Sequence, residues 1–290
     1  MTAEQPQVSP GLHPGMSNDA YHAEAEHLSS TRLKKALPEK YREGDLSAPA
    51  LAFGTLVHEV VLEPHLLDRY TVLDAAKIGL KADGTPAQNP TMTSAWKRAV
   101  AEAEAEGRTV VAAEDWDRAH RMAEAIRAHG EANEILHEGE GAYELSAFVA
   151  DGDTKIKARF DRLIPGGIVD LKTTSAKPGE RSLKRVTVDY LYHLSAAHYL
   201  TVADLLGLDV ETFTLVYVGK DAPHYVSVTD LASDLIDEGR DLRTLALDRI
   251  AGRVEPYEGA TGRITLHAYG HTPAAVEPTI PADFEWSPND

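Results

Sequence analysis

The run TKIKARFDRLIPGGIVDLKTT occupies residues 154–174 and holds the clearest secondary-structure signal in the chain. Two β-prone segments flank Pro-Gly-Gly, a strong turn signal. A third β-prone segment, AYELSAFVA at residues 142–150, precedes them across an Asp-Gly-Asp turn. Three short strands joined by tight turns predict an antiparallel meander.

Alternation along these segments brings polar side chains together. Residues two apart in a strand share a face, so Lys157, Arg159 and Asp161 share one face and the apolar residues between them take the other. Asp170 and Lys172 share a face of the following strand. If the short turn sets the register, Asp161 and Asp170 lie near each other beside Lys172. Adjacent carboxylates repel unless a proton or cation lies between them, and Mg²⁺ or Mn²⁺ suits such oxygen ligands.

Helical spacing and capping signals predict further elements on both sides of the meander. Residues 75–94 lack sustained periodicity and contain Gly, Pro and Asn, so we expect mostly loop there. The order of elements predicts an α/β or α+β domain with a mixed central β-sheet flanked by helices. The expected helices cover 17–21, 29–37, 49–63, 94–107, 114–129, 190–206 and 230–250, and two further strands cover 211–218 and 224–228.

Composition limits the class of protein. The 290 residues include no cysteine, which excludes disulfides, zinc–thiolate sites and iron–sulfur clusters. No run approaches about 18 apolar residues, and the polar start of the chain is unlike a signal peptide, so we expect a cytoplasmic protein. Residues 1–15 are expected to be disordered, residues 16–252 to form one domain, and residues 253–290 to form an irregular, proline-containing tail.

The charge distribution is uneven. The formal net charge is −17, which disfavours contact with nucleic-acid phosphates over most of the surface. Residues 153–185 contain nine Lys and Arg against four Asp and Glu, a local charge of +5, which leaves −22 for the remainder. We therefore expect a confined basic channel there, which attracts a polyanion while the rest of the surface repels it.

A histidine lies in the apolar helical run LAFGTLVHEVVLEP, residues 51–64. Gly54 and His58 are four residues apart and share a helical face, so another backbone is expected to approach closely at Gly54. A single histidine in an apolar helix is more often a buried structural residue than a metal ligand. Its assignment to a site therefore depends on more than its own position.

The four segments LSSTRLKKAL, LAFGTLVHEVVLEP, KARFDRL and IVDLKTT, in this order, resemble the RecE-like (exonuclease VIII-type) group of phage and prophage exonucleases. That group belongs to the RecB-like branch of the PD-(D/E)XK nuclease superfamily, whose signature includes the D-x₈-D-x-K spacing seen from Asp161 to Lys172. The resemblance covers about residues 16–228 and implies the PD-(D/E)XK nuclease fold.

The resemblance also implies roles for individual residues. His58, Asp161 and Asp170 would bind Mg²⁺ or Mn²⁺, with the Leu171 backbone carbonyl as a further ligand. Lys172 would support the nucleophilic water. The implied activity is that of a double-strand DNA exonuclease, working 5′ to 3′ and leaving single-stranded tails for annealing-type DNA recombination. Family members act as homotetramers on DNA ends, beside a RecT-like annealing protein.

Expected DNA contacts are less specific. The family pattern Y-x-x-Q-A-A-x-Y corresponds here to YHLSAAHY, with Ser195 at the glutamine position, and Ser is too short for the same reach. His193 or His198 would compensate only if it faces the site. Glu144 shares a face with Ser146 and offers another carboxylate, but a solvated position on an edge strand is expected. The residues assigned to DNA binding are Lys157, Arg159, Thr173, Thr174, Lys177, Ser195 and Tyr199.

Two other functions stay open on the sequence alone. One is a RecB-like nuclease of different polarity, or an endonuclease. The other is a non-catalytic DNA-binding module on the same fold, which the retained carboxylates and Lys172 disfavour, since a buried carboxylate pair without a cation is costly.

Overall fold

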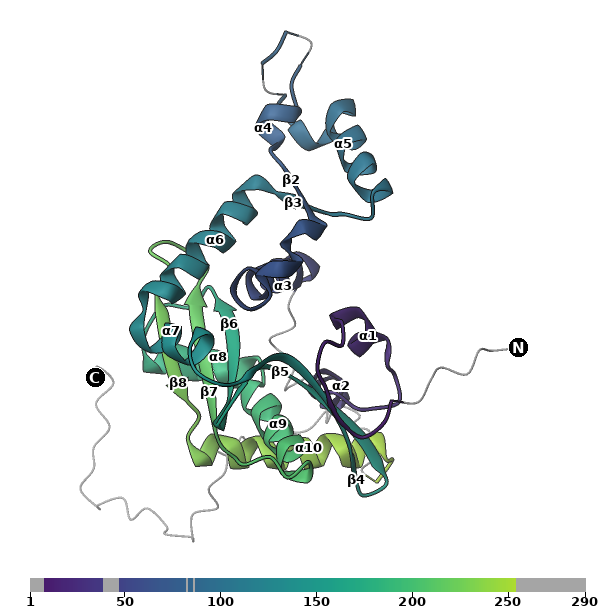
Figure 1. The fold of residues 1–290 in the computed structure, drawn as a ribbon, viewed down its shortest axis with the longest axis vertical. Coiled ribbons are helices and arrows are strands. Elements are labelled where there is room, and N and C mark those ends of the chain that lie inside the picture. The colour runs from purple at the N-terminus through teal and green to yellow at the C-terminus, as the bar shows by residue number, and fades with distance from the viewer. Residues whose placement is uncertain (1–7, 39–46, 82, 86, 254–290) are drawn as a thin grey trace, which may run out of the picture. The chain divides into compact units, whose positions relative to one another are not determined.

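The central sheet positions most of the site residues. The computed structural model describes residues 8–38, 47–81, 83–85 and 87–253. Its larger sheet has six strands in the order β1-β4-β5-β6-β7-β8, of which β4 to β8 are labelled in Figure 1. The strands are β1 (Gly11–His13), β4 (Ala142–Asp151), β5 (Thr154–Ile164), β6 (Gly166–Thr174), β7 (Val210–Gly219) and β8 (Val226–Asp230).

The predicted meander is confirmed. Strands β4, β5 and β6 pair antiparallel, with Ile164 opposite Gly167 at the Pro-Gly-Gly turn. Strand β7 then pairs parallel with β6 and antiparallel with β8, so the sheet is mixed, as expected. A parallel neighbour requires a crossover connection, and α8 (Glu180–Asp189) and α9 (Tyr192–Leu205) supply it.

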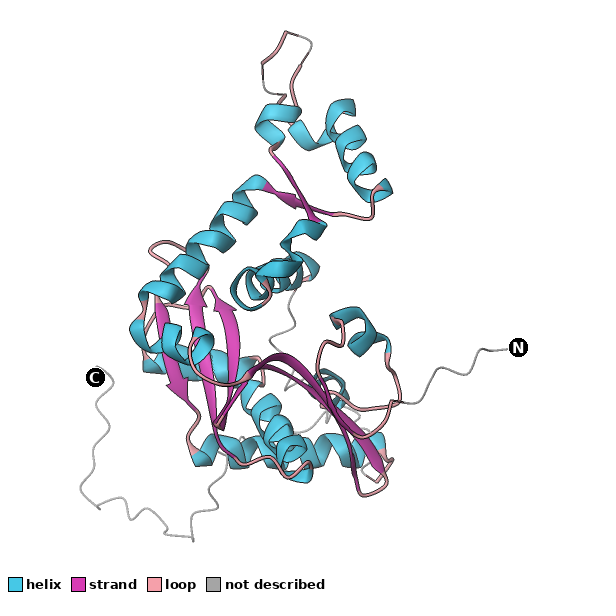
Figure 2. Cartoon of the chain, viewed as in Figure 1, coloured by secondary structure: helices cyan, strands magenta, loops and turns pink. Residues whose placement is uncertain are grey.

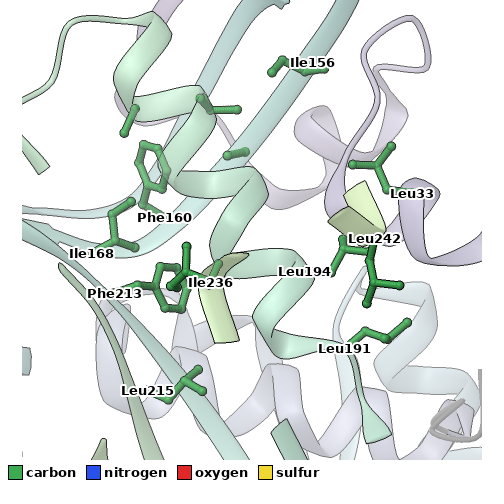
Figure 3. Close-up of a cluster of buried hydrophobic side chains, with 14 of the residues drawn as sticks. Leu33, Ile156, Phe160, Ile168, Leu191, Leu194, Phe213, Leu215, Ile236 and Leu242 are labelled. Carbon is green, nitrogen blue, oxygen red and sulfur yellow. The ribbon is translucent and has the colours of Figure 1, made fainter. Parts of the chain in front are cut away.

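Helices pack on both faces of the sheet (Figure 2). Consecutive residues of β6 point to opposite faces, so Ile168 joins one core and Val169 and Leu171 join the other. The core around Ile168 includes Phe160, Phe213 and residues of α2 (Ser30–Ala36), α9 and α10 (Ser233–Ile250) (Figure 3). The other core includes residues of α3 (Ala48–Leu62), α6 (Ala113–Ala128) and α7 (Gly130–His137).

The chain between α3 and α6 forms a small substructure. Two short strands, β2 (Tyr70–Leu73) and β3 (Thr109–Ala112), pair parallel to each other. Residues 75–94 are mostly irregular, as expected, although they include α4 (Ala75–Ile78) and a 3₁₀ turn, η3 (Pro90–Met92). The remaining elements between α3 and α6 are η2 (Pro64–Arg69) and α5 (Ser94–Ala105).

The first two helices begin where capping signals predict. The Ser17 and Ser29 side chains accept hydrogen bonds from Ala20 N and Arg32 N at the starts of α1 (Asn18–Ala23) and α2. The expectation of disorder is wrong for residues 11–13, because β1 pairs with the outer side of β4. The rest of that expectation, for residues 1–7, and the expected tail from residue 254 onward lie outside the described residues.

Candidate active site

His58 reaches the β5–β6 hairpin from helix α3. Its Nε2 lies 2.8 Å from the Leu171 carbonyl oxygen on β6, although 113 residues separate the two. Its Nδ1 lies 3.5 Å from Asp161 Oδ2 on β5. Because a carbonyl oxygen only accepts, Nε2 carries the proton in this contact and Nδ1 faces the carboxylates. The structure thus brings His58 to Asp161, as the resemblance implied.

The Asp161 side chain continues the hydrogen bonding between β5 and β6 where their backbone pairing ends. Paired residues of β5 and β6 run from the turn to Arg162 opposite Val169, and beyond them Asp161 Oδ2 accepts a hydrogen bond of 2.8 Å from Leu171 N. The carboxylate is therefore fixed by the backbone of the neighbouring strand. Burial, together with the negative charge of Asp170, raises the pKa of Asp161 to about 7. This arrangement favours a cation between the two carboxylates.

Lys172 forms an ion pair in the same place. Its Nζ lies 2.5 Å from Asp170 Oδ2 and 3.3 Å from the Leu171 carbonyl oxygen. The Tyr192 ring on α9 packs beside it, with its centroid 5.4 Å from Nζ. Burial disfavours the charged lysine, but Asp170 and Asp161 outweigh burial and raise its pKa. Lys172 therefore carries its positive charge at neutral pH.

Glu144 belongs to the site, contrary to the expectation of a solvated side chain. Its Oε1 lies 3.8 Å from His58 Nδ1 and its Oε2 lies 2.7 Å from Arg159 Nε. The residue has φ +44°, a left-handed value that costs energy for a non-glycine residue. The pairing of β4 with β5 passes from Tyr143 to Leu145 and skips Glu144, which leaves its side chain free to turn toward His58. The expectation was wrong because β4 is not an edge strand and because His58 and Arg159, both distant in the sequence, lie beside the Glu144 carboxylate.

The donor atoms suit a divalent cation. His58, Glu144 and Asp161 each offer one atom, and these atoms lie within 4.8 Å of one another. Burial opposes a charge on His58, but Asp161 and Glu144 raise its pKa to about 9, so the imidazole holds a proton that a metal ion would displace. The carboxylate oxygens suit Mg²⁺ or Mn²⁺, and the imidazole nitrogen is a ligand more typical of transition metals.

A cavity of about 360 Å³ opens beside these groups. Its lining includes His58, Glu144, Asp170 and Lys172, together with Gly54 on α3, whereas Asp161 does not line it. The expected close approach of another backbone at Gly54 is wrong, because a Cβ built there meets nothing within 4 Å. The missing side chain instead leaves room in the cavity, one helical turn from His58.

The residues assigned to DNA binding divide into two groups. Thr173, Ser195 and Tyr199 line the cavity, which agrees with a role in substrate contact. Thr174 is buried and accepts from Ala176 N through its hydroxyl, and Lys177 is exposed outside the cavity lining. His193 and His198 are fully buried away from the lining, so neither takes the place of the missing glutamine at Ser195.

The expected basic channel on β5 is wrong for this strand. Lys157 is buried and binds the carbonyl oxygens of Tyr21 and Glu24. Arg159 is also buried and donates to Glu144, Ser146 Oγ and the Met16 carbonyl oxygen. Both cations therefore have protein partners and do not face a polyanion. Sequence alone did not reveal this, because the partners lie 13 to 143 residues away along the chain.

Comparison with known proteins identifies the family and the fold. The model of a PDDEXK-like domain of unknown function (DUF3799) matches residues 25–255. A crystal structure of a "putative exonuclease" from Eubacterium rectale is similar with a TM-score of 0.53 and 15% identity, covering 89% of this chain and 97% of that one. This identity shows the fold alone.

A second solved structure, that of SSO0001, has 16% identity, covers 70% of this chain and 88% of that one, and has a TM-score of 0.28, too low to support an argument. Comparison with curated proteins gives no match. None of the helices among the described residues has both the length and the apolar character needed to cross a membrane. The family match covers most of the chain, and the chain belongs to the PDDEXK-like domain family DUF3799.

Proposed function

We propose that this protein is a divalent-metal-dependent exonuclease that hydrolyses phosphodiester bonds at double-stranded DNA ends. The observation that carries the proposal is that His58 of α3 and Asp170 and Lys172 of β6 line one cavity, while Asp161 of β5 lies beside His58. Family membership and fold together support a nuclease. The exonuclease activity, the 5′ to 3′ polarity and the role in DNA recombination rest on the resemblance of the sequence.

Each residue has a distinct part in hydrolysis. His58, Asp161 and Asp170, with Glu144 and the Leu171 carbonyl nearby, would hold the metal ion. A bound Mg²⁺ or Mn²⁺ supplies Lewis acidity toward a phosphoryl oxygen and toward the attacking water. Lys172 keeps its charge and stabilises the negative charge that develops on the phosphoryl oxygens in the transition state. Asp161 and His58 are held in place by the backbone of Leu171, so little reorganisation is needed.

The proposal extends to assembly and partners. By resemblance, the protein acts in the cytoplasm as a homotetramer that encloses a DNA end, beside a RecT-like single-strand annealing protein. Sedimentation equilibrium of the purified chain tests the tetramer, and co-purification with such an annealing protein tests the partner. A monomer that digests DNA would remove the assembly from the proposal without removing the activity.

The decisive experiment compares DNA substrates. Linear duplex, nicked circle, covalently closed circle and single strand are incubated with Mg²⁺, with Mn²⁺ and with a chelator. We expect digestion of linear duplex only, dependent on the metal and absent in Asp170→Asn. Labels at either end of one strand report the polarity. Rapid linearisation of closed circles would indicate an endonuclease instead, and DNA binding without cleavage in any metal would indicate a binding module.

A further inference from the structure

Two lysines outside the catalytic hairpin reach the same cavity. Lys34 lies on α2, and Lys220 directly follows β7. Both line the cavity together with Asp170 and Lys172. They come from segments 186 residues apart; Lys34 lies in the short basic segment LSSTRLKKAL, whereas no feature of the sequence marks Lys220.

Lys34 has protein partners but no counter-ion among the described residues. Its Nζ donates to the Tyr190 carbonyl oxygen at 3.0 Å and lies 5.3 Å from the centroid of the Tyr192 ring. The other lysine beside that ring, Lys172, is paired with Asp170. Burial first, and then the charge of Lys172, lower the pKa of Lys34 to about 7, although the charge of Asp170 acts in the opposite direction. Lys34 is partly buried, and an ammonium without a carboxylate partner in such a position is costly, so an anion in the cavity would offset part of that cost.

Lys220 is in a similar situation. Its backbone N–H donates to the Thr174 carbonyl oxygen at 2.8 Å, which fixes its position beside the end of β6. Its side chain is half-buried, and within the described ranges no carboxylate lies within ion-pair distance of it. Burial and the charge of Arg118 lower its pKa. The ammonium is therefore available to an anion in the cavity.

We propose that Lys34 and Lys220 bind backbone phosphates of the DNA strand on either side of the phosphate that is hydrolysed. The inference rests on the proposed function and deepens it by naming the groups that hold the substrate. Ammonium groups bind phosphates as point charges and tolerate any base sequence. The phosphates are thus held by α2 and the β7–β8 connection, and the cations of β5 take no part.

The experiment measures how DNA affinity depends on salt. A fluorescent duplex is titrated with the full chain at several NaCl concentrations, with Ca²⁺ replacing Mg²⁺ and gel analysis to confirm that the DNA stays intact. Each phosphate contact contributes about 0.7 to 0.9 to the slope of log K against log salt. We expect Lys34→Gln and Lys220→Gln each to lower the slope by about that amount.

Lys155→Gln is the matched control. Lys155 is a β5 lysine whose Nζ lies 2.7 Å from Glu26 Oε2, and its side chain is 47% exposed. It should keep the wild-type slope, and Lys34→Arg should keep most of the binding because the charge remains. Thermal unfolding of each variant checks the fold, and Lys220→Gln, whose side chain has the smaller structural role, decides the question if Lys34→Gln fails to fold.

Two failures are distinguishable. A wild-type slope in Lys220→Gln, with wild-type protein that binds and cleaves DNA, overturns the assignment of these lysines but leaves the proposed nuclease intact. A slope lowered in Lys155→Gln instead would return the phosphates to β5 and also overturn it. Wild-type protein that neither binds nor cleaves DNA contradicts the proposed function itself.

Discussion

Strand β5 and the cavity both contain positively charged side chains, but those of β5 are occupied by protein acceptors and two of those in the cavity have no carboxylate partner among the described residues. Arg159 and Lys157 of β5 are almost completely buried, and each has two or more protein acceptors. Lys34 and Lys220 line a cavity and have main-chain contacts but no carboxylate partner within the described chain. The β5 cations connect the sheet to the N-terminal segment, whereas the cavity lysines are placed to meet a ligand.

The difference shows what a local excess of charge can and cannot indicate. A run of Lys and Arg in the sequence measures only composition, and partners distant in the sequence decide whether each charge reaches solvent. Segment 153–185 has the largest positive excess, yet its strand residues are neutralised by carbonyl and carboxylate groups. The best-placed cations of the site come partly from segments with no excess at all.

The largest effect on stability is expected at Arg159. Arg159→Met leaves the Glu144 carboxylate buried without its guanidinium and leaves the Ser146 hydroxyl and the Met16 carbonyl oxygen without their donor. Loss of one member of a buried ion pair costs about 3 to 5 kcal/mol of unfolding free energy. Urea denaturation in the presence of chelator measures it. The exposed pair of Lys155 and Glu26 is the control, because Lys155→Ala should cost at most about 1 kcal/mol.

Equal stabilities for these two variants would contradict a structural role for Arg159. The pairing of Glu144 with Arg159 would then not hold β4 against β5, and the left-handed backbone of Glu144 would need another explanation. A large loss for Lys155→Ala would show that the exposed pair is more important than its geometry indicates.

The next largest effect is expected on the cleavage rate when the ammonium group of Lys172, a cavity residue, is removed. Lys172→Ala should lower the single-turnover rate about 100- to 1000-fold at saturating Mg²⁺, the range found when one transition-state donor is removed. DNA affinity should change much less, because Lys34 and Lys220 remain. Rapid-quench cleavage of end-labelled duplex measures the rate. Near wild-type cleavage would remove Lys172 from the chemistry.

Much of this arrangement was predictable from local sequence. The alternation in residues 154–174 and the Pro-Gly-Gly turn are enough to place Asp161 near Asp170, because the register of a hairpin follows from its turn. His58 was assigned by resemblance, since a helix pattern does not show which strand the helix packs against. The short strands β1, β2 and β3 gave no signal, because three or four residues are too few to display alternation. The position of Glu144 was missed because its partner His58 comes from a helix whose packing the sequence does not show.

A smaller effect concerns the pH dependence of stability at His198, on the β5 side of the comparison. His198 is fully buried, and its Nε2 lies 3.0 Å from the Lys157 carbonyl oxygen. Burial lowers the pKa of His198 to about 4, and the neighbouring Arg243 adds to this, while the Lys157 carbonyl and Asp151 act in the opposite direction. In the unfolded chain the pKa is about 6.5, so protonation favours unfolding below that pH.

Uncharged His198 therefore contributes favourably to the free energy of unfolding, and protonation removes this contribution. It is fully present above pH 6.5 and is lost as the pH falls toward 4, by about 3 kcal/mol in total. Urea denaturation at pH 7.5, 6.0 and 5.0 measures the slope, and His198→Gln, which keeps a donor for the Lys157 carbonyl, should flatten it. An unchanged slope in the variant would show that His198 is not the group responsible.

The smallest effect is expected at Gly54, which tests whether the cavity is open on the α3 side. Glycine within a helix costs about 0.5 to 1 kcal/mol relative to alanine, and a Cβ at Gly54 meets nothing within 4 Å. Gly54→Ala should therefore raise the unfolding free energy by about that amount without slowing cleavage. Gly54→Trp should keep the fold but fill the space beside His58, weakening DNA binding and cleavage together.

If Gly54→Ala is destabilising, another segment packs against α3 at this position and the DNA strand enters from the α2 side alone. If Gly54→Trp binds and cleaves like wild type, the substrate does not pass over Gly54, and the path between Lys34 and Lys220 must run along the opposite wall of the cavity.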